Sequence, residues 1–390
     1  MDIVNKSYFN VIKYSIIVTG LSRHHPMWFN FLAKSFTFFL IFSLLSAQIA
    51  GFVKVYGDID LVLGCCPPIC YSSISAIIYV NSNLHVKQIN IVFEKIREDW
   101  NLLTSESELD ILHKYGRKCR AYNLLYTYGL FIQVVLYHSA HGIPLLINIL
   151  KKNNKPKPLM LPVECGLDSE KYFGLITLHS YVFGYFSTTG IATGGTLLVM
   201  FLEHACGIFD IIGHKLIHAI KENINSTNKV VSKKKFRQEI KICVAMHKRI
   251  VLFITDIQNV FSTAYLFVYG IKIILLSVTA VQFVMSTKNT ENRVRFGFFG
   301  LFQVMHIFFL TIPTQHLLDN SLNLSTCIYN NTDWYHLPDE SKKLLLIIMR
   351  KGSQPATFTV GKIFVPSIQF FTKVLQTSVS YFTVLRSVQE

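Results

Sequence analysis

Long apolar runs alternate with polar connections along the whole chain. Seven of these runs are near or above the length at which a helix, rising about 1.5 Å per residue, crosses a hydrocarbon core of about 30 Å. They are residues 35–53, 61–80, 124–150, 173–203, 256–286, 296–317 and 358–388. The pattern predicts an all-α, polytopic membrane protein with seven transmembrane helices, whose termini lie on opposite sides of the bilayer.

The connections on one side have helical patterns of their own. After the second run, Ile89, Val92 and Ile96 recur at helical spacing, which predicts that the second span continues as an amphipathic helix. On the other side, three prolines between residues 151 and 172 predict an irregular loop or lid. The chain then divides into residues 1–204 (the N-terminal region and four spans), 205–255 (a helical extension), 256–317 (two spans), 318–356 (an anchor segment that packs on the extension) and 357–390 (the last span).

Composition and charge fix the class and the orientation. The chain is 51% hydrophobic and 16% charged, as expected of a membrane protein. Its 38 Lys and Arg form no patch interleaved with aromatic residues, so nucleic acid is excluded as a partner. The N-terminus and the even-numbered connections hold 25 of these cations, against 10 in the odd-numbered connections and the C-terminal tail. Because positive loops stay inside, we expect a cytoplasmic N-terminus and an extracellular C-terminus.

The last span has a polar face. At about 100° per residue, one stripe holds Lys373, Gln376, Thr377, Ser380 and Ser387, and the branched apolar pair Val384 and Val388 narrows its outer end. If several copies surround an axis, this stripe lines a water path with a hydrophobic gate. The alternative is a stripe buried against neighbouring helices, where hydroxyls and amides join helices together. The pore interpretation requires an oligomer.

The same segment carries a family resemblance. The runs Gly361–Phe364, Ser367–Phe370 and Ser378–Arg386 resemble the terminal signature of insect odorant receptors. Related gustatory receptors, which end in a Thr-Tyr pair and a Gln-Phe, are the alternative; this chain has Ser380-Tyr381 and no such Gln-Phe. The resemblance implies a ligand-gated, non-selective cation channel in which this chain is the tuning subunit of a heterotetramer with the odorant co-receptor. It also implies a small volatile odorant as ligand and the plasma membrane of olfactory sensory neuron dendrites as location.

The orientation places one set of aromatic, apolar and hydroxyl residues in the outer halves of the spans. Members of the resembled family bind odorants in this region, and Ser139 with Gly142 resembles the small-residue pair that lines their cavity. Bundle packing is the ordinary role of such side chains. The predicted ligand-binding residues are Ile69, Ser72, Tyr137, Ser139, Gly142, Ile143, Leu146, Thr177, Tyr181, Phe299, Phe302 and Met305.

Other chemistry finds little support in the sequence. His214 and His218 have zinc-compatible spacing, but two ligands without a third predict no metal site. No Ser-His-Asp or Cys-His arrangement has local support, so we expect neither an enzyme nor a cofactor.

Cys165 could pair with Cys65 or Cys66 if its loop folds over the bundle. A metabotropic seven-helix receptor is opposed by the charge count, and a proton-coupled transporter would need acidic pairs or an inverted repeat.

Overall fold

The computed structural model of the chain describes residues 7–22, 25–151, 159–227, 229–286 and 290–389. Within these ranges every regular element is a helix, and the single β-bridge joins Val360 to Phe364. The all-helical prediction is therefore confirmed. The elements are η2 (Ser7–Phe9), α1 (Asn10–Val18), α2 (Met27–Lys54), α3 (Ile59–Leu84), α4 (Val86–Leu102), α5 (Glu106–Leu150), α6 (Phe173–Asn225), α7 (Lys229–Met285), α8 (Thr290–Asn331), η4 (Trp334–His336), α9 (Asp339–Gly352) and α10 (Ile368–Gln389).

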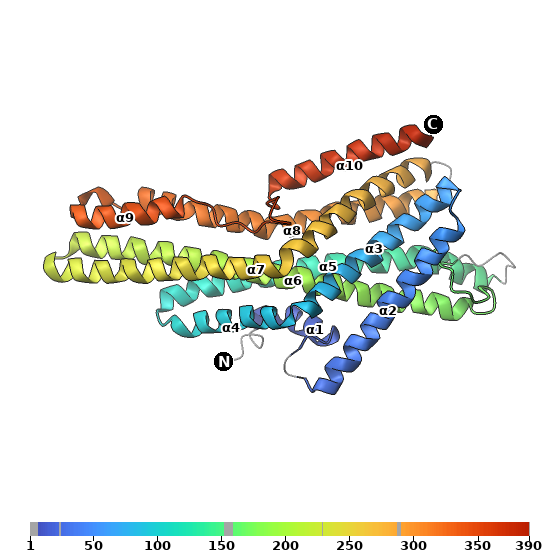
Figure 1. Ribbon diagram of the computed structural model, residues 1–390, viewed down its shortest axis with the longest axis horizontal. Coiled ribbons are helices and arrows are strands. Elements are labelled where there is room, and N and C mark those ends of the chain that lie inside the picture. The colour runs from blue at the N-terminus through green and yellow to red at the C-terminus, as the bar shows by residue number, and fades with distance from the viewer. Residues whose placement is uncertain (1–6, 23–24, 152–158, 228, 287–289, 390) are drawn as a thin grey trace.

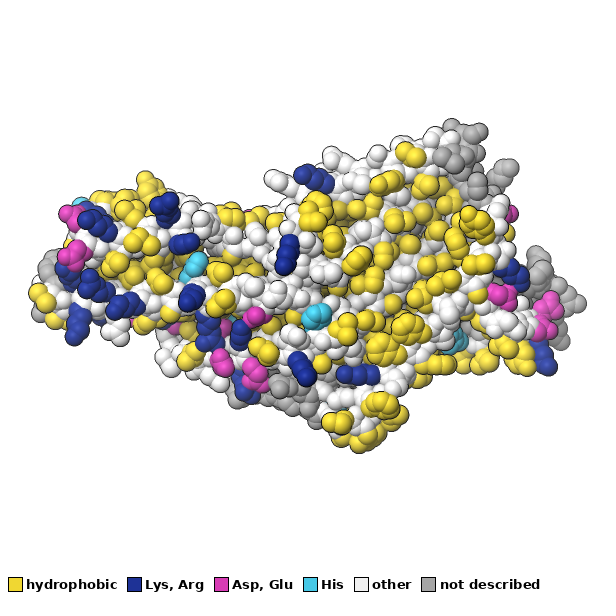
Figure 2. All heavy atoms as spheres, in the orientation of Figure 1, with side chains coloured by type: hydrophobic (Ala, Val, Ile, Leu, Met, Phe, Trp, Pro, Cys, Tyr) yellow, Lys and Arg dark blue, Asp and Glu magenta, His cyan; other side chains and the backbone are white. Residues whose placement is uncertain are grey.

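The molecule is elongated because its central helices are much longer than a membrane span (Figure 1). At one end, which we call the hairpin end, α6 and α7 turn back on each other beside α9. At the other, the lid end, lie residues 159–172, the described part of the connection between α5 and α6. Among the described helices, α2, α3, α5, α6, α7 and α8 are long and apolar enough to cross a membrane. Charged side chains gather toward the hairpin end and again at the tip of the lid end, and a broad apolar belt lies between them (Figure 2).

Helix α6 forms the axis of the core and is buried over most of its length. Small residues allow other helices to approach it closely. A Cβ on Gly194 would lie 2.4 Å from Cγ2 of Ile78, and one on Gly195 would lie 2.5 Å from the hydroxyl of Tyr126. The Gly194-Gly195 pair is therefore a packing site between α3, α5 and α6.

The segment after α3 differs from the prediction. The chain does not continue as one helix: α3 ends at Leu84, His85 is non-helical, and α4 begins at Val86. The break allows the apolar face of α4, with Ile89, Val92 and Ile96 buried, to turn onto the bundle. Lys95 of α4 pairs with Asp256 of α7 and fixes this placement.

The last span is also shorter than the run 358–388 that predicted it. Residues 353–367 are not helical, and Gly361 and Lys362 both adopt positive φ, at 60° and 59°. The Gly361 amide donates to the Ser262 carbonyl at 3.1 Å, and a Cβ at Gly361 would lie 2.6 Å from Cδ2 of Leu266. This tight turn, followed by Pro366, delays the helix until Ile368. The remaining 22 residues of α10 still extend about 33 Å.

Candidate functional site: a lidded cavity and an exposed polar helix face

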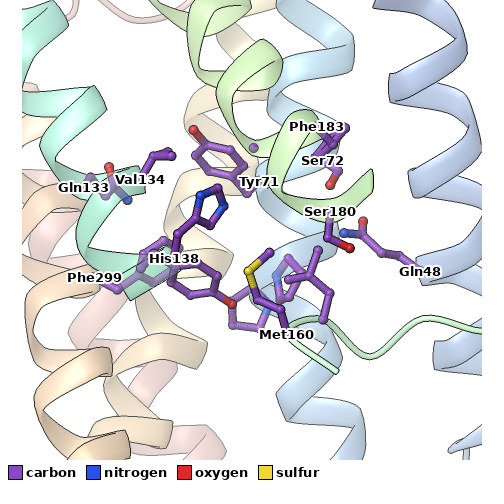
Figure 3. Close-up of a pocket in the computed structure, with 15 residues that line it drawn as sticks. Gln48, Tyr71, Ser72, Gln133, Val134, His138, Met160, Ser180, Phe183 and Phe299 are labelled. Atoms are coloured by element: carbon purple, nitrogen blue, oxygen red, sulfur yellow. The ribbon is translucent and has the colours of Figure 1, made fainter. Parts of the chain in front are cut away.

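A cavity lies inside the bundle near the lid end (Figure 3). Its empty volume is about 510 Å³, counting its open mouth, and its wall is mainly apolar. Four of the long helices, α3, α5, α6 and α8, contribute to the wall, together with Gln48 of α2 and two residues of the lid. The lining residues are Gln48, Pro67, Pro68, Tyr71, Ser72, Gln133, Val134, Tyr137, His138, Met160, Leu161, Ser180, Phe183, Gly184 and Phe299.

Three polar side chains of this wall have atoms without a hydrogen-bond partner among the described residues. Gln48 and Ser72 are 1% and 0% exposed, and neither the Gln48 amide nor the Ser72 hydroxyl is paired. The Nδ1 atom of His138 is also buried and unpaired. An unsatisfied buried polar group costs about 1–3 kcal/mol, so this arrangement suits a bound molecule that brings its own polar atoms.

The wall itself is rigidly positioned. The Tyr71 hydroxyl and the Thr188 hydroxyl share a hydrogen bond of 2.6 Å between α3 and α6. His138 stacks edge-on against Tyr181 with ring centroids 4.6 Å apart. A Cβ at Gly184 would lie 2.6 Å from Nε2 of His138, so glycine is what lets the imidazole rest on the α6 backbone.

Residues 159–172 cover the cavity as a lid. Met160 and Leu161 are buried in it, and the Glu164 amide donates to the Ala47 carbonyl of α2 at 2.9 Å. The Glu164 carboxylate pairs with Lys54 at 2.5 Å. The hydrogen bond from Lys54 lowers the pKa of Glu164 below its ordinary value.

The lid backbone also approaches α2 closely, because a Cβ at Gly51 would lie 2.7 Å from the carbonyl oxygen of Pro162. Cys165 is exposed and free, and so it forms no bridge with Cys65 or Cys66. The predicted loop is therefore a folded cover. Two of its three prolines, Pro156 and Pro158, lie outside the described residues.

The structure divides the predicted ligand-binding residues among three environments. Ser72, Tyr137 and Phe299 line the cavity. Tyr137, Ser139, Ile143, Phe299 and Phe302 line a second hollow between α5 and α8. Gly142 packs beneath the Tyr181 hydroxyl, Thr177 is buried with its hydroxyl unpaired, and Ile69, Leu146 and Met305 line neither hollow.

Sequence reasoning missed several of the cavity's polar and lid residues. Gln48 belongs to a span that the pocket prediction left out, and Met160 and Leu161 belong to the lid. His138 was passed over although it adjoins Tyr137. The sequence signal that could have identified Gln48 is an isolated Gln in an apolar span, because intramembrane polar residues are rare and mostly functional.

The polar stripe of α10 faces away from the rest of the chain. Lys373, Gln376, Thr377, Ser380 and Ser387 are exposed, and Val384 is 56% exposed. The opposite face is buried: Val374 packs against the bundle, and the Ser378 carbonyl accepts a 3.1 Å hydrogen bond from Ser277 of α7. The stripe is therefore not covered by any of the residues that the structure describes. The side chain of Val388 lies outside the described ones.

A bundle of six long apolar helices, among the described residues, places the chain in the class of multi-pass membrane proteins. A family model described as "7tm Odorant receptor" matches residues 69–379. The chain therefore belongs to the seven-transmembrane odorant receptor family.

Individual relatives and solved structures agree with this membership. The chain is 25% identical to odorant receptor Or2 of Anopheles gambiae over 38% of this chain and 39% of that one. It is 25% identical to the odorant receptor coreceptor of Aedes aegypti over 38% of this chain and 31% of that one. These alignments thus span less than half of either relative. The fold is similar to that of olfactory receptor OR5 from Machilis hrabei, solved with eugenol: the TM-score is 0.81, with 15% identity, 98% of this chain and 100% of that one covered.

Proposed function

We propose that the chain is the tuning subunit of a ligand-gated, non-selective cation channel and that a small volatile odorant opens it. The single observation that carries this proposal is the lidded apolar cavity with unpaired polar groups from Gln48, Ser72 and His138. In this proposal the hairpin end is cytoplasmic, and the lid and the C-terminus are extracellular, in the plasma membrane of olfactory sensory neuron dendrites. The charge distribution along the chain supports that orientation.

The chemistry of the cavity wall indicates the class of ligand. Burial of apolar area provides most of the affinity, at about 25 cal/mol per Å², and one or two hydrogen bonds set the orientation of the ligand. Gln48 and Ser72 both supply a donor and an acceptor. Eugenol, which the Machilis receptor holds, has this chemistry: an aromatic ring with a hydroxyl and an ether oxygen. We expect ligands of that size and polarity.

The exposed stripe of α10 supports the pore. Several of its hydroxyls bond to carbonyls of their own helix, as Thr377 does to Lys373 and Ser387 to Val384. Lys373, Gln376 and Ser380 remain on an open face, which in a bilayer needs water or other subunits. Copies of α10 around a shared axis would provide both. The co-receptor relatives support the odorant co-receptor as the partner in a heterotetramer.

Contacts between α10 and its neighbours offer a route from ligand to gate. Tyr269 of α7 meets Phe370 of α10 with ring centroids 5.2 Å apart, and Phe308 of α8 meets Phe371 at 5.4 Å. Helix α8 also supplies Phe299 to the cavity. A ligand that fits the cavity better when α8 is displaced would shift the population toward an open α10, and only this difference in affinity opens the channel.

Substitution of the gate tests the proposal. Val384→Ala, co-expressed with the co-receptor, is expected to raise ligand-free current severalfold with unchanged surface expression, because a smaller apolar ring is easier to wet. Val379→Ala is the matched control: Val379 is 60% exposed on the same helix but lies away from the stripe. Unchanged currents in both Val384→Ala and Val388→Ala would remove the gate assignment. A C-terminal epitope tag is expected to be accessible in intact cells and an N-terminal tag inaccessible, the reverse of a metabotropic receptor.

A further inference from the structure

A second hollow lies beside the cavity, on the outer surface between α5 and α8. Its empty volume is about 1010 Å³, counting its open side. It shares three wall residues with the cavity, Gln133, Tyr137 and Phe299. We call it the side groove. Its other lining residues are Leu136, Ser139, Ala140, Ile143, Pro144, Val294, Arg295, Phe298 and Phe302.

The side groove opens toward lipid. Its rim residues Leu136, Ile143 and Phe298 are 43%, 58% and 51% exposed, and they belong to two of the helices long and apolar enough to span the membrane. An exposed apolar face on such helices is stable only in contact with hydrocarbon. On the lid side, the described residues 159–172 are held to α2 by Glu164 and by the close approach of Pro162 to Gly51.

Only a thin partition separates the side groove from the cavity. Tyr137 and Phe299 form it, with ring centroids 5.8 Å apart. Arg295 holds Tyr137 from the groove side: its guanidinium carbon lies 5.0 Å from the ring centroid, and its Nη2 donates to the Tyr137 hydroxyl at 3.5 Å. The Nε atom of Arg295 is buried and has no hydrogen-bond partner in the part of the chain that the structure describes. Tyr137 and Phe299 each line both hollows, so a movement of either ring would change the partition.

We propose that the ligand reaches the cavity sideways from the bilayer, through the side groove and past Tyr137. This inference rests on the proposed function, because it describes access to the same cavity. The occupant of the groove is an uncharged, lipid-soluble small molecule with a hydrogen-bond acceptor. The unpaired Nε of Arg295 gives that acceptor a first partner, and the exchange of the Arg295 hydrogen bond from Tyr137 to the ligand frees the partition.

A change in the access route alters the rates of ligand association and dissociation but leaves the dissociation constant unaltered. This difference makes the proposal testable. Ala140 lines the groove but not the cavity, so Ala140→Trp fills the route alone. For eugenol as the probe, binding to the purified chain in phosphatidylcholine nanodiscs is followed by stopped flow. Association and dissociation are both expected to slow by about tenfold, because a raised barrier on one path slows both directions equally. The dissociation constant is expected to stay the same.

Two matched variants separate the side groove from other effects. Ile132→Trp adds a similar ring to an exposed position of α5 that lines neither hollow, and its rates are expected to equal those of the wild type. Lys54→Ala loosens the lid and is expected to leave the rates unchanged. Faster binding in Lys54→Ala, or unchanged rates in Ala140→Trp, would overturn the lateral route. So would a changed dissociation constant without slower rates, since it would make the groove part of the binding site.

A reversible block covers the case in which Ala140→Trp does not fold. Ala140→Cys is labelled in the nanodisc with benzyl methanethiosulfonate, with labelled wild type in parallel because the chain has other free cysteines. Slow rates that a reductant restores support the route, and rates insensitive to the label contradict it. Binding to the purified chain is independent of currents. Normal binding kinetics without ligand-gated current would therefore refute the proposed channel function and leave the access route standing.

Discussion

Two clusters of buried polar groups, one around Glu203 of α6 and one beside the cavity, differ in their partners. Toward the hairpin end, Glu203 is 1% exposed and pairs with both His316, at 2.8 Å, and Lys118, at 3.4 Å. Asp99 likewise joins His204 at 3.0 Å and Arg249 at 2.9 Å across α4, α6 and α7. Toward the lid end, the amide of Gln48 and the hydroxyl of Ser72 are just as buried and have no partner.

The contrast shows where the buried polar groups find partners within the chain and where they do not. Paired charges between long helices fix one arrangement of the hairpin half, since breaking a buried pair leaves an uncompensated charge. Unpaired groups around a cavity leave the lid half incomplete until something binds. On the proposed function, a ligand in the cavity would supply the hydrogen bonds that Gln48 and Ser72 lack.

The largest effect is expected when Glu203, the buried acid of the paired cluster, is removed. Glu203→Leu leaves Lys118 and His316 without their buried partner, and we expect a loss of about 3 kcal/mol in the free energy of unfolding. Thermal unfolding of the purified receptor measures this. Glu340→Ala is the control, because its pair with Lys233 is exposed on both sides and should leave the unfolding midpoint unchanged. Equal effects of the two substitutions would mean that the buried network does not hold the hairpin half.

A smaller loss of local stability is expected when the contact between the lid and α2 is disturbed. The Cβ of Gly51→Ala would meet the Pro162 carbonyl oxygen at 2.7 Å, so the lid backbone must shift. We expect a local loss of about 1.4 kcal/mol, which makes the Glu164 amide exchange its hydrogen about tenfold faster. Gly64→Ala in α3 is the matched control, since a Cβ there meets nothing within 4 Å. Equal exchange rates in the two variants would show that the lid is not seated on Gly51.

The sequence predicted the helices well and the cavity only in part. Long apolar runs are a local property, so the spans and the helical extensions beyond them could be located from periodicity alone. The turn at Gly361 depends on a contact with a distant residue, the Ser262 carbonyl, and leaves a weaker local signal. The same holds for Gln48 and His138. Which polar side chain of a span faces a cavity and which finds a partner is decided by neighbouring helices.

The smallest predicted change in the free energy of unfolding is a gain, whereas the two changes above are losses. Gln48→Leu removes an amide that has no partner while nearly keeping its volume, and we expect the ligand-free receptor to gain about 1 kcal/mol in the free energy of unfolding. Gln258→Leu is the matched control, because the Gln258 amide donates to Thr359 at 2.6 Å and its removal should cost about 1 kcal/mol. The same Gln48 variant should bind hydroxylated volatiles more weakly than the wild type. If Gln48→Leu destabilised the receptor as Gln258→Leu does, the amide would have a structural partner, and the lid half would be as complete as the hairpin half.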